Sequence, residues 1–179
     1  MNNLIGVIEY TRIMIDRYQN KDGVAIDMTL GKGNDTLYLA DKFADIVAFD
    51  IQQEAIDVSN EKLEGINNVQ LIKDSHENFD KYIKDEVDLF IYNLGYLPGF
   101  SKDITTKSES TIESLKKALI QLKRKGIVII VVYVGHQEGY EESKVIEDYL
   151  KLIDKEYFTI SKYQVMSENA PYVVCINKK

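Results

Sequence analysis

The chain has 179 residues, of which 45% are hydrophobic and 28% are charged, and it carries a net charge of −7. We therefore expect one globular domain spanning residues 1–179, and we exclude wholesale disorder, a membrane span and a signal peptide, since no apolar run approaches ~20 residues. The single cysteine, Cys175, excludes an internal disulfide and, with only two histidines, a Cys/His zinc site, so we expect a cytoplasmic protein without a metal.

Helical and strand-like patterns alternate through the first half of the chain. Apolar residues recur at helical spacing from Leu4 to Tyr18, and short apolar runs that end in a polar residue follow. Gly65 marks the end of one helix. The predicted elements are, in order, a helix over 4–18, a strand over 24–27, a helix over 36–44, a strand over 46–50, a helix over 53–65, and strands over 68–74 and 87–93.

A loop over 94–108 leads into the second half. Ser110 and Glu113 have the spacing of a capping box, which predicts the start of a helix that continues to Lys123. An uninterrupted apolar run then predicts a strand over 126–136. The remaining predicted elements are a helix over 140–153 and two strands, over 157–165 and 172–178.

Short strands that alternate with helices indicate right-handed βαβ units, and hence an α/β fold with a doubly wound, mostly parallel sheet. No helix is predicted between the last two strands, so we expect them to form an antiparallel C-terminal hairpin at one edge. Five βα units closed by such a hairpin form the Rossmann-like layout of class I methyltransferases.

Polar residues end four of the predicted strands. Asp27, Asp50, Asp74 and Asn93 would therefore lie together at the carboxyl edge of the sheet, where doubly wound folds bind their ligands. The turn that follows a strand explains any one of these residues. Four of them at one edge indicate a binding site.

The first of these turns, Asp27–Thr36, discriminates between ligands. Gly31 and Gly33 allow the backbone to approach a ligand closely. Thr36 stands where the dinucleotide fingerprint has its third glycine, and no Gly-Lys-Ser/Thr sequence follows the strand, which argues against NAD and Walker A sites. The Asp27 carboxylate would repel a pyrophosphate but attract an ammonium group, which S-adenosyl-L-methionine (SAM) carries at its amino acid end.

The next two strand ends fit the rest of that molecule. Asp50 can accept hydrogen bonds from both ribose hydroxyls, as the equivalent acid does in dinucleotide folds. Asp74 and Ser75 would face the adenine, whose exocyclic amine can donate to a carboxylate. In chain order the three strand ends describe an adenosyl group joined to an amino acid, and they predict SAM as the cofactor.

Four segments resemble class I SAM-dependent methyltransferases, and the similarity covers essentially the whole chain: DMTLGKGNDT, IVAFD, KDS and IYNLGYLPG. A narrower similarity is to a small bacterial family first described as rRNA methylases, whose members are understood to methylate tRNA. This similarity rests on Asp27–Thr36, Asn93–Gly99, Thr105-Thr106 and Gly135-His136. Many members have a second glycine where this chain has Phe100.

The resemblance implies a reaction and a set of cofactor-binding residues. The reaction would convert 5-aminomethyl-2-thiouridine at the tRNA wobble position to 5-methylaminomethyl-2-thiouridine, with the anticodon stem-loop as the partner. The cofactor-binding residues would be Asp27, Thr29, Gly31, Gly33, Asn34, Asp35, Thr36, Asp50, Gln52, Asp74, Ser75 and Asn93.

Three residues are candidates for catalysis on the acceptor side: Asn93, Tyr96 and His136. Asn93 and Tyr96 have the spacing of the Asn-Pro-Pro-Tyr/Phe motif of amino-methyltransferases, with both prolines replaced. The Asn93 carbonyl can accept a hydrogen bond from the amine and aim its lone pair, and Tyr96 offers a flat face to a base. His136 is the candidate proton acceptor, although a turn explains this histidine equally well. We expect His76 and Cys175 to be structural.

The net charge of −7 stands against an RNA substrate. Basic residues on and after the loop could contact the anticodon stem-loop, with recognition shared across a homodimer. They are Lys102, Lys107, Lys116, Lys117, Lys123, Arg124 and Lys125. Two alternatives stay open: a SAM-dependent methyltransferase of a small-molecule amine or of rRNA, and a nucleotide-binding oxidoreductase or non-catalytic module on the same fold.

Overall fold

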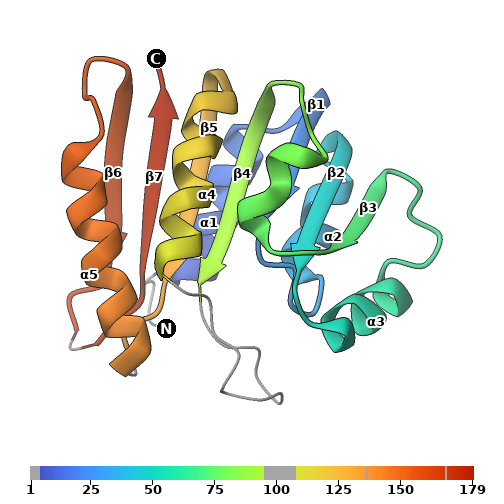
Figure 1. The fold of residues 1–179 in the computed structure, drawn as a ribbon, viewed down its shortest axis with the longest axis horizontal. Helices are drawn as coiled ribbons and strands as arrows, with labels where there is room; N and C mark the ends of the chain where they lie inside the picture. Colours follow the sequence, from blue (N-terminus) through green and yellow to red (C-terminus); the bar gives the residue numbers. More distant parts are fainter. Residues whose placement is uncertain (1–4, 95–107, 136, 168) are drawn as a thin grey trace.

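The computed structural model describes residues 5–94, 108–135, 137–167 and 169–179. A seven-stranded sheet in the order β3-β2-β1-β4-β5-β7-β6 forms its centre (Figure 1). The strands are β1 (Asn20–Asp27), β2 (Phe43–Asp50), β3 (Val69–Lys73), β4 (Val87–Leu94), β5 (Leu122–Val132), β6 (Phe158–Gln164) and β7 (Tyr172–Lys178). The helices are α1 (Val7–Arg17), α2 (Asn34–Ala40), α3 (Gln53–Lys62), α4 (Ser108–Gln121) and α5 (Gln137–Leu152), with a 3-10 helix η1 (His76–Lys81).

The sheet has the predicted doubly wound topology. The first five strands pair in parallel, and β7 pairs antiparallel with both β5 and β6, which confirms the C-terminal hairpin. The chain runs outward from β1 to β3 and then crosses to β4 on the other side of β1. The carboxyl ends of β1 and β4 therefore flank the point where the strand order reverses, which is the usual ligand position in such sheets.

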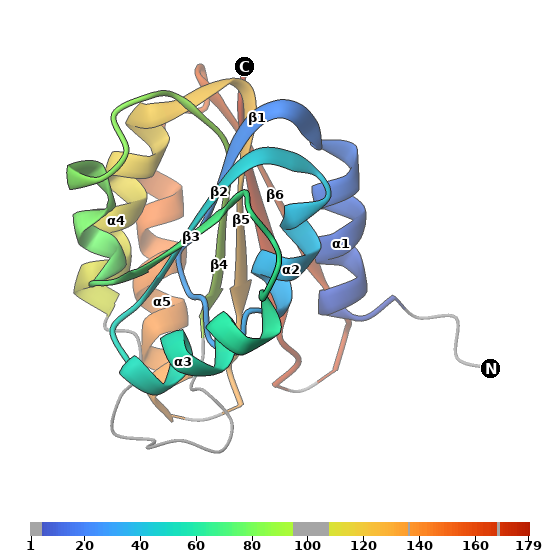
Figure 2. The same cartoon turned by 90° about the vertical axis from the view of Figure 1, so that its right-hand side faces the viewer.

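Helices cover both faces of the sheet (Figure 2). Alternate residues of β4 show the two layers: Leu89 and Ile91 pack in the cluster with α1 and α2, and Phe90 and Tyr92 pack with η1, α4 and α5. Burial on both faces explains why the parallel strands are continuous apolar runs. None of the described helices is both long and apolar enough to cross a membrane.

The structure corrects three predicted boundaries. The helix predicted over 36–44 ends at Ala40, because Phe43 is buried and begins β2, where it pairs with Asn20. The capping-box prediction is wrong, because Ser110 already lies inside α4, whose buried Thr111 donates to Glu142 of α5 at 3.0 Å. The strand predicted from residue 126 begins earlier, at Leu122.

Two smaller differences concern local packing. No element was predicted over 76–81, where η1 forms a short turn of helix that buries Phe79. Ile8, Thr11 and Ile15 lie at helical spacing within the first predicted helix, yet Ile8 is 55% exposed whereas Thr11 and Ile15 are buried. A single helical turn has too few residues to produce a detectable period, and one stripe does not fix how far a helix rotates on its sheet.

Candidate active site

The β1–α2 turn lies at the centre of the carboxyl edge and is held from both sides. On the β4 side, Met28 N donates to Ile91 O at 2.9 Å and Thr29 Oγ1 accepts from Asn93 N at 2.7 Å. On the β2 side, Leu30 N donates to Phe49 O at 2.9 Å. The turn is therefore fixed by the two strands that flank β1, and the predicted convergence of strand ends is confirmed.

Asp27 lies beneath this turn and is fully buried. Its carboxylate accepts hydrogen bonds from Thr29 N at 3.0 Å and from the Thr36 hydroxyl at 2.6 Å. Burial, and then the charge of Asp35, raise the pKa of Asp27 to about 7. Within the described part of the chain, no Lys or Arg forms an ion pair with it. Thr36 is also fully buried, so Asp27 and Thr36 form a buried pair that supports the turn from beneath.

Gly33 allows the β1–α2 turn to approach α3 closely. It has φ +70°, and a Cβ at this position would lie 2.9 Å from Ser59 Oγ. The Ser59 hydroxyl in turn donates to Gly31 O at 3.1 Å. Ser59 is thus a supporting residue that the sequence analysis missed, because its only signal was a buried position on a predicted helix.

Asp50 ends β2 and braces the same turn. Its two carboxylate oxygens accept from Gly31 N at 3.0 Å and from Gln52 N at 2.9 Å. Burial raises its pKa. Ile51, which the sequence analysis did not select, is 52% exposed directly beside it and offers an apolar surface at this edge.

Asp74 is held by its own turn. Its carboxylate accepts from Ser75 N at 2.7 Å, Asn78 Nδ2 at 2.9 Å and Tyr82 OH at 2.8 Å. Partial burial opposes the shift, but these hydrogen bonds lower the pKa of Asp74.

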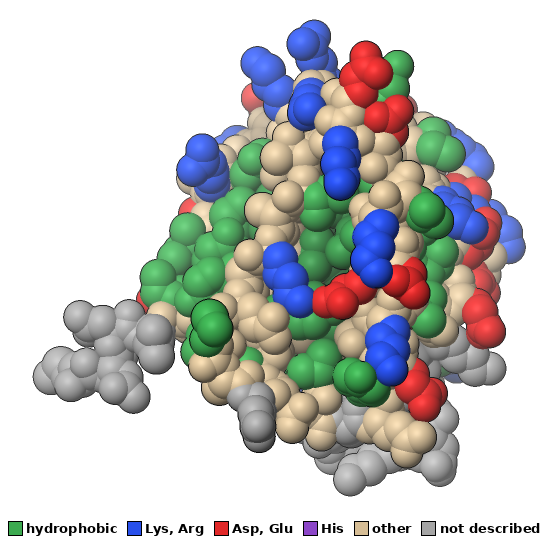
Figure 3. Space-filling model, turned by 90° about the vertical axis from the view of Figure 1, so that its left-hand side faces the viewer, with side chains coloured by type: hydrophobic (Ala, Val, Ile, Leu, Met, Phe, Trp, Pro, Cys, Tyr) green, Lys and Arg blue, Asp and Glu red, His purple; other side chains and the backbone are tan. Residues whose placement is uncertain are grey.

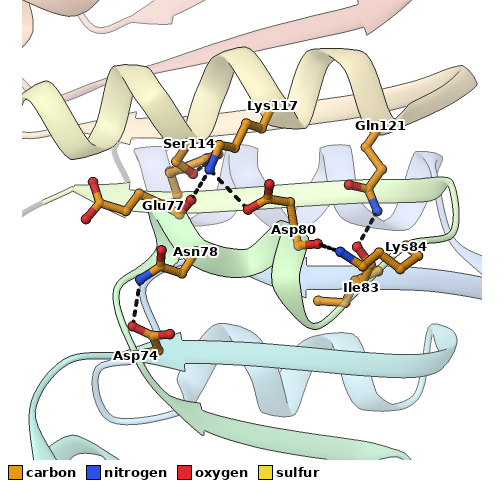
Figure 4. A network of polar contacts seen from close by, with 10 residues as sticks. Asp74, Glu77, Asn78, Asp80, Ile83, Lys84, Ser114, Lys117 and Gln121 are labelled. Atoms are coloured by element: carbon orange, nitrogen blue, oxygen red, sulfur yellow. Dashed lines mark hydrogen bonds and ion pairs between the residues drawn. The ribbon is translucent and has the colours of Figure 1, made fainter.

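The η1 helix that carries Asn78 is tied to α4 (Figure 4). Lys117 Nζ contacts Glu77 O at 2.7 Å and Asp80 at 3.1 Å, and Gln121 donates to Ile83 O at 2.9 Å. The position of the Asp74 turn therefore depends on the packing of α4.

Asn93 faces the first turn of α2. Its side-chain nitrogen donates to Asp35 Oδ2 at 3.0 Å. Tyr133 follows β5 and feels the same carboxylate. Burial, and then the charge of Asp35, raise the pKa of Tyr133. The sequence analysis did not select Tyr133 as a site residue, because an aromatic residue at the end of an apolar run is typical of the hydrophobic core.

Several predicted site residues lie outside the described residues. Of the catalytic candidates these are Tyr96 and His136, and the loop positions Phe100, Thr105 and Thr106 join them. Asn34 is described and exposed, and its side chain accepts from Lys62 of α3.

The two residues expected to be structural are buried. His76 is 8% exposed, burial lowers its pKa to about 4, and its ring lies edge-on to Tyr92 at 5.9 Å. Cys175 is 1% exposed within β7, where it packs in the core.

The basic residues expected to contact RNA do not form one surface in the described part of the chain, and Lys116 is exposed on α4. Lys117 pairs with Asp80 and Lys123 with Asp88, so both have partners within the protein. Arg124 and Lys125 stand at the amino end of β5, opposite the carboxyl edge. Figure 3, viewed from the β6 side, shows Lys and Arg side chains gathered at that amino end, at the top of the view. Lys102 and Lys107 lie outside the described residues.

The arrangement at the carboxyl edge fits SAM. Asp27 and Asp50 give the edge a negative potential, which suits the sulfonium and ammonium charges. A carboxylate has about four acceptor positions, so Asp50 retains capacity for ribose hydroxyls beside its two backbone partners. Ile51 supplies an apolar surface of the kind an adenine ring covers.

Comparison with known proteins agrees with this fit. Residues 46–177 match the family model described as "Putative rRNA methylase". The chloroplastic tRNA (mnm(5)s(2)U34)-methyltransferase of Arabidopsis thaliana is 30% identical over 188 residues, which cover 96% of this chain and 69% of that protein. The ribosomal RNA small subunit methyltransferase H of Thermosipho africanus is 35% identical over 81 residues, covering 42% of this chain and 28% of that protein.

Two crystal structures are similar along almost the whole chain. A "putative rRNA-methylase" from Clostridium thermocellum has a TM-score of 0.96 at 34% identity, covering 99% of this chain and 100% of its own. A "putative methyltransferase" from Streptococcus mutans, in complex with SAH, has a TM-score of 0.92 at 34% identity, covering 98% and 99%. The chain therefore belongs to the family described as "Putative rRNA methylase", and it is a SAM-dependent methyltransferase with the class I fold.

Proposed function

We propose that the enzyme methylates 5-aminomethyl-2-thiouridine at the wobble position of tRNA, giving 5-methylaminomethyl-2-thiouridine. The observation that carries this proposal is the similarity to the Arabidopsis tRNA methyltransferase over 96% of this chain. The similarity to methyltransferase H covers only 42% of the chain and supports a shared portion of the fold rather than a shared substrate.

The cofactor half of the site would be built on the three acidic strand ends. SAM, when bound, supplies a methyl group on a sulfonium. Asp50 would accept from the ribose hydroxyls, and the Asp74–Ser75 turn would face the adenine. Gly31 and Gly33 would let the backbone approach the amino acid portion, while Asp27 contributes its charge from below.

The acceptor half would be built on Asn93. An alkylamine with a pKa near ~10.4 is mostly protonated in water, and it must lose a proton before its lone pair can attack a carbon. The negative edge would attract the ammonium form, and the Asn93 carbonyl would accept from the amine N–H and aim the lone pair. Orientation of this kind can supply on the order of 7–11 kcal/mol of barrier reduction.

We assign two further roles to residues of the resemblance. Tyr96 would stack on the modified uracil, and His136 would accept or relay the proton. Tyr96→Ala should then raise KM more than it lowers kcat, because stacking holds ground state and transition state similarly. Tyr96→Phe keeps the ring face and should stay near parental activity.

The anticodon stem-loop would be the part of tRNA that is recognised. Since the net charge is −7, we expect local contacts and shared recognition across a homodimer. The affinity for RNA should fall with rising salt, whereas the affinity for a small-molecule amine should change little.

Mass spectrometry of tRNA nucleosides tests the proposal. Cells that lack the protein should accumulate 5-aminomethyl-2-thiouridine, and the parental gene should restore the methylated nucleoside. Asn93→Ala should not restore it, although its SAM affinity should stay close to that of the parent. Unchanged wobble nucleosides together with a missing rRNA methylation would overturn the proposal in favour of an rRNA substrate.

A further inference from the structure

Besides its pairing with β5, Asn93 is held by the β1–α2 turn and by the first turn of α2. Its backbone N donates to Thr29 Oγ1 at 2.7 Å, and its side-chain nitrogen donates to Asp35 Oδ2 at 3.0 Å. Asp35 and Asn93 are 58 positions apart and come from α2 and β4, so the fold alone brings them together. Both side chains are only half-buried, at the edge where the strands end.

The chemistry of this pair is directional. An ionised carboxylate only accepts hydrogen bonds, whereas a primary amide both donates and accepts. Asp35 can therefore bond only to the amide nitrogen of Asn93, which turns the amide oxygen away from it. From the described residues, that oxygen accepts no hydrogen bond, so it is the atom left for a donor outside this pair.

The charge of Asp35 also acts on two further residues. Asp27 lies close enough for the Asp35 charge to contribute to its raised pKa, and Tyr133 at the end of β5 is affected in the same way. Asp35 therefore belongs electrostatically to a group of residues contributed by β1, β4 and the end of β5.

We propose that Asp35 is a positioning residue for methyl transfer: it fixes the Asn93 amide so that the carbonyl oxygen receives the N–H of the acceptor. This role extends the resemblance, which grouped Asp35 with the cofactor-binding residues, and it rests on the proposed amine acceptor. The acceptor ammonium releases one proton to the solvent through the proposed acceptor His136. Its nitrogen then forms the new N–C bond as the S–C bond of SAM breaks, and SAH leaves with the electron pair of that bond on its sulfur.

Two substitutions with a matched control test this role. Asp35→Ala removes the acceptor, and Asp35→Asn keeps the shape but allows the Asn93 amide to bond in either orientation. Asp41→Ala removes the exposed carboxylate at the opposite end of α2. We expect kcat to fall on the order of 10²-fold for Asp35→Ala and less for Asp35→Asn, with KM for RNA and the Kd for SAH within about twofold of the parent. Asp41→Ala should leave all three unchanged.

A second measurement uses the free protein. The side-chain amide signal of Asn93, identified by its loss in Asn93→Ala, should move toward the position of exposed amides in Asp35→Ala and Asp35→Asn, and not in Asp41→Ala. In the Asn93→Ala background, adding Asp35→Ala should lower kcat little further, because the two residues act as one unit.

Two results would overturn the inference. One is a loss of SAH affinity in Asp35→Asn as large as its loss of kcat, which would make Asp35 a cofactor residue. The other is an unmoved Asn93 amide signal. If the parent methylates another RNA or a small amine, the proposed function fails, yet kcat on that substrate and the amide signal still decide the role of Asp35.

Discussion

Two aspartates on neighbouring strands, Asp27 and Asp88, meet opposite electrostatic surroundings. Asp88 of β4 accepts from Asn20 Nδ2, Val24 N and Lys123 Nζ, each at 3.0 Å. Burial alone would raise the pKa of Asp88, but these contacts outweigh it and lower the pKa. Asp27 of β1 has two neutral donors and a neighbouring carboxylate, and its pKa is raised to about 7.

The difference separates a carboxylate that stabilises the fold from one to which we assign a role in cofactor binding. Asp88 joins β1, β4 and β5 near their amino ends and is neutralised by Lys123. Asp27 lies at the carboxyl end of β1, where its charge is not compensated by a described residue. The free protein is destabilised by that charge, and a cationic cofactor would offset it.

The largest effect should come from Asp50, the other acid at the carboxyl edge. Asp50→Ala should weaken SAM binding at least on the order of 10²-fold, because each charge-assisted hydrogen bond to the ribose contributes about 1.5–3 kcal/mol. Calorimetry with SAM measures this, with circular dichroism to confirm folding. Asp45→Ala, an exposed position on the same strand, is the control. SAM affinity within twofold of the parent would contradict the assignment of this strand end.

Asp27→Asn should stabilise the protein by about 2 kcal/mol above pH 7, or roughly 4–8 °C in Tm, while weakening SAM binding several-fold. The folded pKa of about 7 exceeds the ordinary aspartate value of 3.8, so ionisation disfavours the folded state. The parent therefore loses stability as pH rises from 3.8 to about 7, and the variant should not. Thermal unfolding across this pH range measures the difference in stability between the variant and the parent. A difference that stays constant at every pH would refute the explanation.

Asp88→Ala should behave in the opposite way. It removes the shared acceptor of three donors and should destabilise the protein by about 1–2 kcal/mol, with little change in SAM affinity. Because the folded pKa of Asp88 is lowered, this deficit should be present at neutral pH and disappear as pH falls through that lowered pKa. Denaturant unfolding and calorimetry together test it; a loss of SAM affinity equal to that of Asp27→Asn would remove the distinction between the two edges.

The smallest effect should come from Tyr82→Phe. It removes one of the three donors to Asp74 but keeps the ring against Phe49, at 5.7 Å between centroids. We expect the variant to lose less than about 1 kcal/mol of stability and to bind SAM within twofold of the parent. Ser75 N and Asn78 still donate to the Asp74 carboxylate. A larger loss of affinity would show that Tyr82 itself contacts the cofactor.

Local sequence patterns were sufficient for the architecture and for bringing the residues of the proposed site to one edge of the sheet. Apolar runs that end in Asp27, Asp50 and Asn93 predicted parallel strands with their ends together, because a βαβ crossover leaves little choice of direction. Boundaries were less certain where one pattern suits two structures. The pattern over 36–44 predicts one helix, but Phe43 and Ala44 belong to β2, because Phe43 pairs with Asn20 of β1.

The sequence by itself determined the fold class and the cofactor, and it predicted the carboxyl-edge site, since residue type and period are local properties of the chain. Only the tertiary structure decided which carboxylate is neutralised and which is not. Lys123 of β5 reaches Asp88 of β4, and among the described residues Asp35 accepts a hydrogen bond from the Asn93 amide. These contacts join residues that are distant in the chain, and the charge state of a buried group depends on all its neighbours in space, which no local pattern records.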